Sequence, residues 1–447
     1  MERHGQPDYL SRQPGDLPSR LRQHSTALKD SSDLDPLIER IGDARIVMLG
    51  EATHGTSEFY RWRAKLSQRL IEEEGFSFVA VEGDWPASYE LNRFIKGYDG
   101  SGDEALDAVR RFHRWPTWMW ANWEMVAFVD WMRRYNVGNE LEERIGFFGL
   151  DVYSLKESLG AVLEFVRRRD PEGVETAYRA LECFEPHGLR GQDYARAVQM
   201  VDANCEQEVV DLLAYIQARA PQFNGDYEGE LNARQNARVL VNAERYYRTM
   251  LRGGPQSWNL RDRHMSRTLD DLLAFHGPNS RAIVWEHNTH VGDAHYTDMR
   301  SNGMINLGQL GRENHGEEEV VLVGFGTHRG HVIAGSAWGA SMQEMKVPAA
   351  MSGSWEDVFH QAGQQGQPDR LLLMDEVQES TAFLKPRGHR AIGVVYREGP
   401  ESAGQYVPTI LPRRYDAFIF IDATEALHPL HIKPSPVEIP ETYPWGM

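Results

Sequence analysis

Cysteine is scarce in this sequence, which contains only Cys183 and Cys205 among its 447 residues. Two cysteines cannot build the framework of several disulfides that stabilises many small secreted domains. Both cysteines lie in stretches with helical patterns. We therefore interpret them as structural thiols of a protein in a reducing compartment.

Long apolar runs are absent as well. No window approaches the roughly 18 consecutive apolar residues that a membrane span needs, and the N-terminal stretch has no apolar segment of the kind found in signal peptides. We expect a cytoplasmic protein that does not contact membrane. Residues 1–33 are polar, contain proline and show no apolar periodicity, so we predict a loose N-terminal arm.

Basic residues are outnumbered, with 48 Lys and Arg against 66 Asp and Glu and a net charge of −18. Such a surface repels the phosphates of nucleic acids, so we expect no nucleic-acid partner and a mild preference for neutral or cationic small molecules. With 41% hydrophobic and 26% charged residues, the composition is that of a globular protein with a sizeable core.

Short, continuous apolar runs recur along the chain, and such runs are typical of strands buried on both faces. Helical patterns separate the early runs, which predicts βα units, whereas the closely spaced last runs are compatible with antiparallel pairing. We predict an α/β fold in which helices cover a mixed, largely parallel central sheet, with residues 34–447 forming a single domain. The predicted strands are residues 45–50, 76–81, 145–150, 281–285, 320–325, 371–374, 391–395 and 417–421.

A long stretch in the middle of the chain carries no strand pattern. It runs from Asp151 to about His276 and is rich in Ala, Glu, Arg and Leu. We predict that residues 152–277, approximately, form a helical insertion folded over the sheet. No internal repeat is visible, so the sequence does not indicate a solenoid.

Polar residues follow the apolar runs at the points where the predicted strands end. In open α/β sheets ligands bind beyond the carboxyl ends of the strands, so these residues are expected to converge on one site. Any single one of them is explained as well by the boundary between strand and loop, but the set favours a site. The strand ends are Glu51, Glu82-Gly83-Asp84, Asp151, Glu286-His287 and Thr327-His328.

The first of these ends begins a cluster, Glu51-Ala-Thr-His54, that precedes a predicted helix. Arg63 falls on the apolar face of this helix, and a buried guanidinium needs a carboxylate partner. Glu51 and Glu82 are the candidate partners, and a purely structural ion pair is the alternative. His54 is suited to take a proton from water, with Glu51 orienting its ring.

A second cluster places His287 and His290 three residues apart. Together with Glu51, His54 and Glu82 they are possible ligands for zinc or another divalent metal. Alternatively, one histidine donates a hydrogen bond to a developing oxyanion and the other holds the substrate. The sequence lacks the His-Glu-x-x-His helix of zinc proteases, which weakens the metal hypothesis. It also lacks the Gly-x-Ser-x-Gly elbow, which argues against a serine hydrolase.

Aromatic residues concentrate in one short run, Arg114-Trp-Pro-Thr-Trp-Met-Trp120. This run is a candidate wall for an apolar pocket that accepts a bulky ligand, although such clusters more often belong to a core or an interface.

Three segments together resemble the erythromycin esterase-like family: Gly50-Glu-Ala-Thr-His-Gly55, Val81-Glu-Gly-Asp-Trp85 and Trp285-Glu-His-Asn-Thr-His290. The resemblance extends from about Asp35 to about Ile421. It implies an α/β sheet with a large helical portion. It also implies hydrolysis of the lactone ester of macrolide antibiotics, by water that a histidine activates, with no covalent serine intermediate and no required metal.

By position in these motifs, the resemblance implies that His54 is the base and that Glu51, Arg63, Glu82 and His287 are tied to activity. It also implies that His290 lines the site, and Arg261-Asp262 resembles a further recurrent segment of the family that we place near the pocket. We expect contacts to substrate from His290, Asp84, Trp85, Asp151, Arg261 and Asp262.

The leading hypothesis is therefore a hydrolase of ester or lactone bonds that acts on a small molecule and uses no cofactor. His54 deprotonates water, Glu51 and Arg63 set its geometry, Glu82 pairs with Arg63 or assists proton transfer, and His287 stabilises the oxyanion. A metal-dependent hydrolase built on the same residues and a non-catalytic binding protein are the alternatives. The substrate is not determined by the motifs, because specificity depends on the divergent helical insertion.

Overall fold

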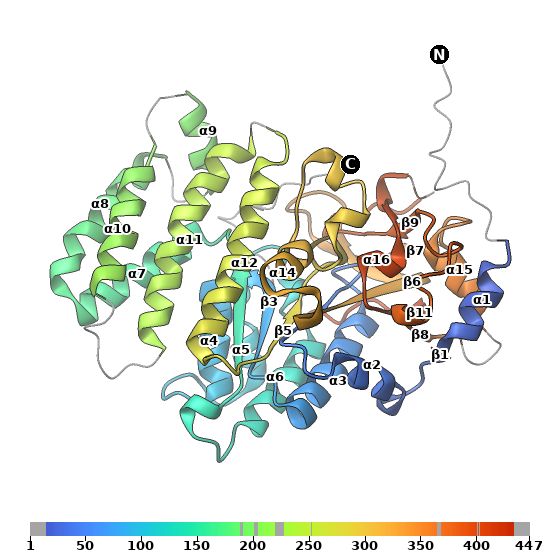
Figure 1. Ribbon diagram of the computed structural model, residues 1–447. Coiled ribbons are helices and arrows are strands. Elements are labelled where there is room, and N and C mark those ends of the chain that lie inside the picture. The colour runs from blue at the N-terminus through green and yellow to red at the C-terminus, as the bar shows by residue number, and fades with distance from the viewer. Residues whose placement is uncertain are drawn as a thin grey trace.

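The computed structural model describes residues 15–187, 191–200, 204–219, 228–251, 253–363, 368–399, 401 and 403–432. A mixed sheet crosses the centre of the molecule and helices cover both of its faces (Figure 1). Its strand order is β1-β8-β11-β6-β2-β5-β3-β4, with β7 paired to β6, and β9 and β10 form a separate ribbon. The α/β prediction is thus confirmed.

Five of the strand pairs in the central sheet are parallel, namely β11–β6, β6–β2, β2–β5, β5–β3 and β3–β4. The pairs at the β1 end and the β6–β7 hairpin are antiparallel. The strands are β1 (Ser25–Ala27), β2 (Ile46–Leu49), β3 (Phe78–Asp84), β4 (Gly146–Asp151), β5 (Ala282–Trp285), β6 (Val320–Gly335), β7 (Met342–Val347), β8 (Arg370–Leu373), β9 (Arg387–Arg390), β10 (Tyr406–Thr409) and β11 (Ala417–Thr424).

Both faces of the sheet are buried, as the continuous apolar runs predict. Along β2, Ile46 and Met48 belong to one hydrophobic core cluster, whereas Val47 and Leu49 belong to the other. Successive side chains of a strand point to opposite faces, so each apolar run supplies both layers of core at once.

The helices outside the insertion are α1 (Leu17–His24), α2 (Asp35–Ile41), α3 (Ser57–Glu74), α4 (Trp85–Lys96), α5 (Ala105–Val109), α6 (Trp123–Tyr135), α13 (Asn288–Val291), α14 (Leu307–His315), α15 (Trp355–Ala362) and α16 (Leu411–Arg414). Glycines in the left-handed conformation end α3 at Gly75 (φ 68°) and α4 at Gly97 (φ 73°). α4 follows β3 directly, whereas residues 50–56 separate β2 from α3.

Helices fill the middle of the chain, in agreement with the predicted insertion. In Figure 1 most of them form the green group on the left of the sheet, where α11 packs on α7, α10 and α12, and α12 contacts β4. The helices are α7 (Leu155–Arg169), α8 (Val174–Phe184), α9 (Gly191–Met200), α10 (Glu206–Arg219), α11 (Gly229–Met250) and α12 (Gln256–His276). No helix of the described residues is both long and apolar enough to cross a membrane.

The prediction of a loose arm over residues 1–33 is wrong for its second half. Leu17 and Leu21 lie four residues apart, so α1 places both on one face, and both are buried. β1 then pairs antiparallel with β8, with Ser25 opposite Leu372. The tertiary contact with β8 orders a segment that is too polar to show a pattern alone. Residues 1–14 lie outside the described part.

Residues 391–395 were predicted as a strand, and this prediction is also wrong. The strand of this region is β9, and the predicted segment makes only isolated bridges, from Ile392 to Thr53 and from Val395 to Gly335. Ile392 N donates to Ala52 O at 2.8 Å. The segment is apolar because it packs across the first motif rather than because it joins the sheet.

The two cysteines are not free thiols, because Cys183 and Cys205 form a disulfide with a Cα–Cα distance of 5.8 Å. The bond joins the end of α8 to the residue that precedes α10. Helix packing brings these positions together, which spacing in the sequence does not reveal. The cysteines therefore no longer indicate a reducing compartment.

Candidate active site

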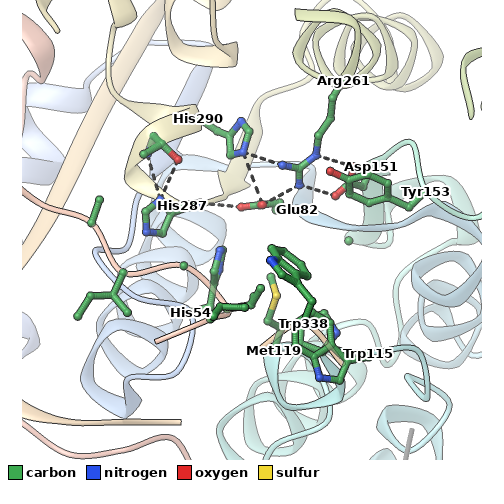
Figure 2. Close-up of a pocket in the computed structure, with 18 of the residues that line it drawn as sticks. His54, Glu82, Trp115, Met119, Asp151, Tyr153, Arg261, His287, His290 and Trp338 are labelled. Carbon is green, nitrogen blue, oxygen red and sulfur yellow. Dashed lines mark hydrogen bonds and ion pairs between the residues drawn. The ribbon is translucent and has the colours of Figure 1, made fainter. Parts of the chain in front are cut away.

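Neighbouring parallel strands bring the predicted polar residues to one edge of the sheet. β4, β3, β5 and β2 lie side by side in that order, and a cavity of about 1320 Å³ opens beyond their carboxyl ends. Side chains of the site that line this cavity are His54, Glu82, Asp84, Asp151, Arg261, His287 and His290. Figure 2 shows most of them converging from the strand ends and from α12.

Glu51 joins His54 to Arg63 behind the cavity. Its Oε1 accepts a hydrogen bond from His54 Nδ1 at 2.8 Å, and its Oε2 accepts one from Arg63 Nη2 at 2.7 Å. Arg63 is fully buried and lies over the rings of Tyr60 and Trp285. Arg63 fixes the Glu51 carboxylate in place, and because its Oε1 accepts from His54, the His54 ring is held with its Nδ1 as the donor.

The electrostatic surroundings of His54 favour its protonated form. Burial by itself would lower the pKa of His54, but the Glu82 and Glu51 carboxylates outweigh burial, and the pKa is raised above its ordinary value of 6.5. His54 is therefore a stronger base than a histidine in water. Since Nδ1 holds a proton, the lone pair that can accept another proton lies on Nε2.

Glu82 is bound differently from the prediction. Its Oε1 accepts from Arg261 Nη2 at 2.7 Å and its Oε2 accepts from His287 N at 2.9 Å, so the partner of Glu82 is Arg261 rather than Arg63. Arg261 also binds Asp151, at 2.6 and 2.9 Å. Burial opposes the charge of Glu82, but His290 and Arg261 outweigh it, and the pKa of Glu82 is well below its usual range.

His287 is held in one tautomer. Thr289 N donates to His287 Nδ1 at 3.3 Å, and the Thr289 hydroxyl lies 2.9 Å from the same atom. A backbone N–H can only donate, so Nδ1 accepts and the proton of the neutral ring lies on Nε2. Burial and the adjacent His54 lower the pKa of His287 well below 6.5, although Glu82 and the Ala52 carbonyl oppose them. His287 is therefore neutral at pH 7.

His290, on α13, is held in place by three residues of α12. Its Nδ1 donates to Asp262 Oδ1 at 2.9 Å, its Nε2 lies 2.9 Å from Arg261 Nη1, and its ring stacks on Trp258 at 4.5 Å. Asp262 lies behind His290, as Glu51 lies behind His54. Each of these histidines is thus oriented by a buried carboxylate.

The structure separates some of the predicted residues from the cavity. Asp84 does line the cavity, where it pairs with Arg114. Trp85 does not: it lies in the core, where it donates to Asn232 and stacks on Phe148. Thr327 and His328 do not end a strand, because β6 continues past them to Gly335 to pair with β7. His328 stacks on His360 instead, at 3.8 Å.

Aromatic residues form a wall opposite the histidines (Figure 2). The Trp-rich run contributes Trp115, Met119 and Trp120 to this wall, as its pattern suggests. Trp338, at the turn between β6 and β7, lies 5.2 Å from Trp115 and was missed in the sequence. Trp258 was missed as well, although it lies on α12 three residues before Arg261, the spacing of one helical turn.

Among the residues that the structure describes, no group of three or more His, Cys, Asp or Glu side chains is arranged to hold a metal ion. The carboxylates that the metal hypothesis requires have other partners: Glu51 binds Arg63, and Glu82 binds Arg261.

Comparison with known proteins gives a match to the family described as erythromycin esterase over residues 71–424. This chain belongs to the erythromycin esterase family. The matched range contains the second and third motifs of this family member and begins after Glu51, His54 and Arg63.

The curated relatives of this family member match it only in part. It is 32% identical over 146 residues to an erythromycin esterase type II of Escherichia coli, which is 32% of each chain. It is 23% identical over 293 residues to a Bacillus subtilis protein named as a hydrolase, YbfO, which is 61% of this chain and 62% of that one. The matches thus span less than two thirds of these relatives.

Solved structures extend the likeness in fold to nearly the whole family member. A Bacillus cereus protein has a TM-score of 0.76 at 19% identity, covering 93% of this chain and 99% of the other. A succinoglycan biosynthesis protein has a TM-score of 0.72 at 20% identity, covering 94% and 98%. An erythromycin esterase variant in an open conformation has a TM-score of 0.65 at 17% identity, covering 94% and 99%.

Proposed function

We propose that this protein is a hydrolase that cleaves an ester or lactone with water activated by His54. The observation that carries the proposal is the hydrogen-bonded series Arg63–Glu51–His54, which ends at the cavity in a basic histidine whose Nε2 has no hydrogen-bond partner among the described residues. A general base needs a ring of fixed tautomer, which the Glu51 contact provides, and its affinity for protons is raised here by Glu82 and Glu51 together.

In the first step, His54 Nε2 takes a proton from water while the water oxygen forms a bond to the carbonyl carbon of the substrate. The carbonyl π electrons move to its oxygen, giving a tetrahedral oxyanion and a His54 imidazolium. Glu51 stabilises this imidazolium across the 2.8 Å hydrogen bond. In the second step the oxyanion collapses, the bond to the alcohol oxygen breaks, and His54 returns its proton to that oxygen.

His287 is the donor that we assign to the oxyanion. Its Nε2 carries a proton, is buried, and makes no hydrogen bond of ordinary geometry with the described residues, although the Ala52 carbonyl lies near enough to interact with this proton. The rings of His287 and His54 are 4.8 Å apart, so the donor and the base act on one reacting group. A neutral histidine donates without bringing a charge that would repel the His54 imidazolium.

The cavity indicates a bulky substrate. Its volume of about 1320 Å³ exceeds the roughly 300–1000 Å³ of ordinary small-molecule pockets. The tryptophan wall offers apolar surface, and the charged groups Asp84, Glu82 and Asp151 are already paired with arginines. We propose a large, mainly apolar lactone, and macrolides are the first class to test because a partial relative is named an erythromycin esterase.

The test is turnover of a macrolide panel and of simple esters by the purified protein, followed as the mass gain of one water. We expect turnover by wild type and a loss of about 100-fold or more in kcat for His54→Ala. His315→Ala is the matched control, since His315 pairs with Asp270 outside the site. Equal rates for His54→Ala and wild type would remove His54 as the base. Binding without turnover would indicate a non-catalytic relative, and rates lost to a chelator would indicate a metal enzyme.

A further inference from the structure

Asn288, which directly follows His287, hydrogen bonds through both its backbone and its side chain. Its backbone N donates to Glu51 O at 2.9 Å, and its backbone O accepts from Arg414 Nη2 at 2.9 Å. Its side chain bonds like a peptide group to Phe325: Nδ2 donates to Phe325 O at 2.7 Å and Oδ1 accepts from Phe325 N at 3.2 Å. Asn288 thereby ties the end of β5 to Glu51 and to β6.

The neighbouring strand leaves room for this amide only because it carries a glycine. A Cβ atom on Gly50 would lie 2.1 Å from Asn288 Oδ1, which no real contact allows. Gly50 N is itself bonded to Val323 O at 2.8 Å, so the backbone cannot shift away without losing a bond of the sheet. The amide is thus wedged between the first motif and β6, and it is fully buried.

A histidine outside all three motifs supports the amide from behind. Asn288 Nδ2 lies 3.2 Å from His389 Nε2, and His389 Nδ1 donates to Glu356 Oε1 at 2.6 Å. Glu356 Oε1 also accepts from Arg390 N at 2.8 Å. His389 and Glu356 are both buried, and neither lines the cavity.

The donor and the acceptor of each hydrogen bond in the series Asn288–His389–Glu356 can be assigned. An amide nitrogen can only donate, so His389 Nε2 accepts, and the proton of His389 lies on Nδ1, where Glu356 receives it. Burial lowers the pKa of His389 despite Glu356, which keeps the ring neutral and able to accept. Glu356 orients His389, His389 orients the Asn288 amide, and Asn288 adjoins His287 in the chain.

We propose that His389 and Asn288 are positioning residues for the reaction, which hold His287 in register with the strand end that carries Glu51. Neither touches the substrate. The kinetic test of this proposal rests on the proposed function, because it measures turnover. The experiment therefore includes a second measurement that does not depend on turnover.

The experiment compares His389→Gln with His389→Asn in the full chain. Gln is long enough to accept from Asn288 and donate to Glu356, whereas Asn is equally polar and one methylene too short to do both. We expect His389→Asn to lose about 10- to 100-fold in kcat with KM within about 2-fold of wild type, since a small misplacement of reacting groups has effects of this size. We expect His389→Gln to recover most of the loss.

The second readout is the ¹⁵N NMR spectrum of histidine-labelled protein, with thermal unfolding recorded to confirm folding. We expect the ring resonances of His287 to move in His389→Asn and to stay near the wild-type positions in His389→Gln. Equal effects of the two variants on kcat, or unmoved His287 resonances in His389→Asn, would overturn the proposal. If wild type hydrolyses none of the substrates, the NMR comparison decides the positioning role alone.

Discussion

His54 and His287, which follow strands β2 and β5 far apart in the sequence, place their rings 4.8 Å apart with planes tilted by 39°. The two histidines are in opposite electrostatic states although they are neighbours. Carboxylates raise the pKa of His54, whereas burial and the proximity of His54 lower the pKa of His287. One ring therefore accepts a proton readily and the other stays a neutral donor. Ester hydrolysis needs both roles, a general base for water and a hydrogen-bond donor for the oxyanion.

Replacing Glu51 with Gln should change the pH dependence of turnover. His54 acts as a base only when it is deprotonated, so kcat/KM rises with pH through the pKa of His54. The Glu51 carboxylate contributes to raising that pKa, and its removal should move the acidic limb of the profile to lower pH while kcat falls. The profile of Glu51→Gln is compared with that of Glu73→Gln, whose side chain lies in an exposed pair with Arg69. A limb that stays in place or moves to higher pH would contradict this account.

Replacing Trp338 with Ala should reduce the affinity for large substrates alone. Trp338 packs at 5.2 Å from Trp115 on the wall opposite the histidines. Full burial of a large apolar side chain against a ligand contributes about 1.5–3 kcal/mol to binding. Without the Trp338 ring, KM for a macrolide should therefore rise about 10-fold or more. KM for a small ester should not change. A parallel rise for both substrates would show that Trp338 acts on the fold rather than on the ligand.

Replacing Glu286 with Gln should alter stability in a pH-dependent way. Glu286 is buried, and neither carboxyl oxygen has a hydrogen-bond partner among the described residues. Burial and the nearby Glu82 raise the pKa of Glu286 well above 4.5. The folded protein thus holds the proton more tightly than the unfolded chain, and this contribution is complete below pH 4.5 and is lost as pH rises.

Gln is neutral at every pH, so Glu286→Gln should gain stability relative to wild type as pH increases from about 5 to about 8. The slope is at most about 1.4 kcal/mol per pH unit for one proton. Thermal unfolding across this range measures it, and Glu317→Gln, at an exposed position, controls for the loss of one charge. A difference that does not grow with pH would mean that Glu286 is ionised in the folded protein.

Breaking the disulfide should destabilise the helical insertion. Cys183 and Cys205 are 22 residues apart, and closing a loop of this length restricts the unfolded chain by about 3 kcal/mol. Cys183→Ser should therefore lower Tm, and a reductant should lower the Tm of wild type but not of the variant. The bond joins α8 to the start of α10, and neither helix contributes a residue to the lining of the cavity, so turnover at low temperature should be retained. An unchanged Tm would indicate that the bond does not form in solution.

Local patterns were sufficient to locate much of the fold and of the site. Continuous apolar runs predicted β2, β3, β4, β5 and β11 to within a few residues, because a strand buried on both faces needs apolar side chains at every position. Polar residues at four of those strand ends predicted the site, since the carboxyl ends of neighbouring parallel strands share one edge. β6 was predicted too short, because the exposed Arg329–His331 stretch interrupts its apolar pattern before the strand continues with buried residues from Val332 to Gly335.

What the sequence by itself determined is therefore the strands β2, β3, β4, β5 and β11 and the polar side chains that follow four of them, because apolar runs and the polar residues after them are local properties. Only the tertiary structure decided the partners: Arg261 rather than Arg63 for Glu82, β8 for the N-terminal segment, Cys205 for Cys183 and His389 for Asn288. Each of these pairs joins residues from distant segments, and a contact between them depends on the strand order and the helix packing, which no local pattern encodes.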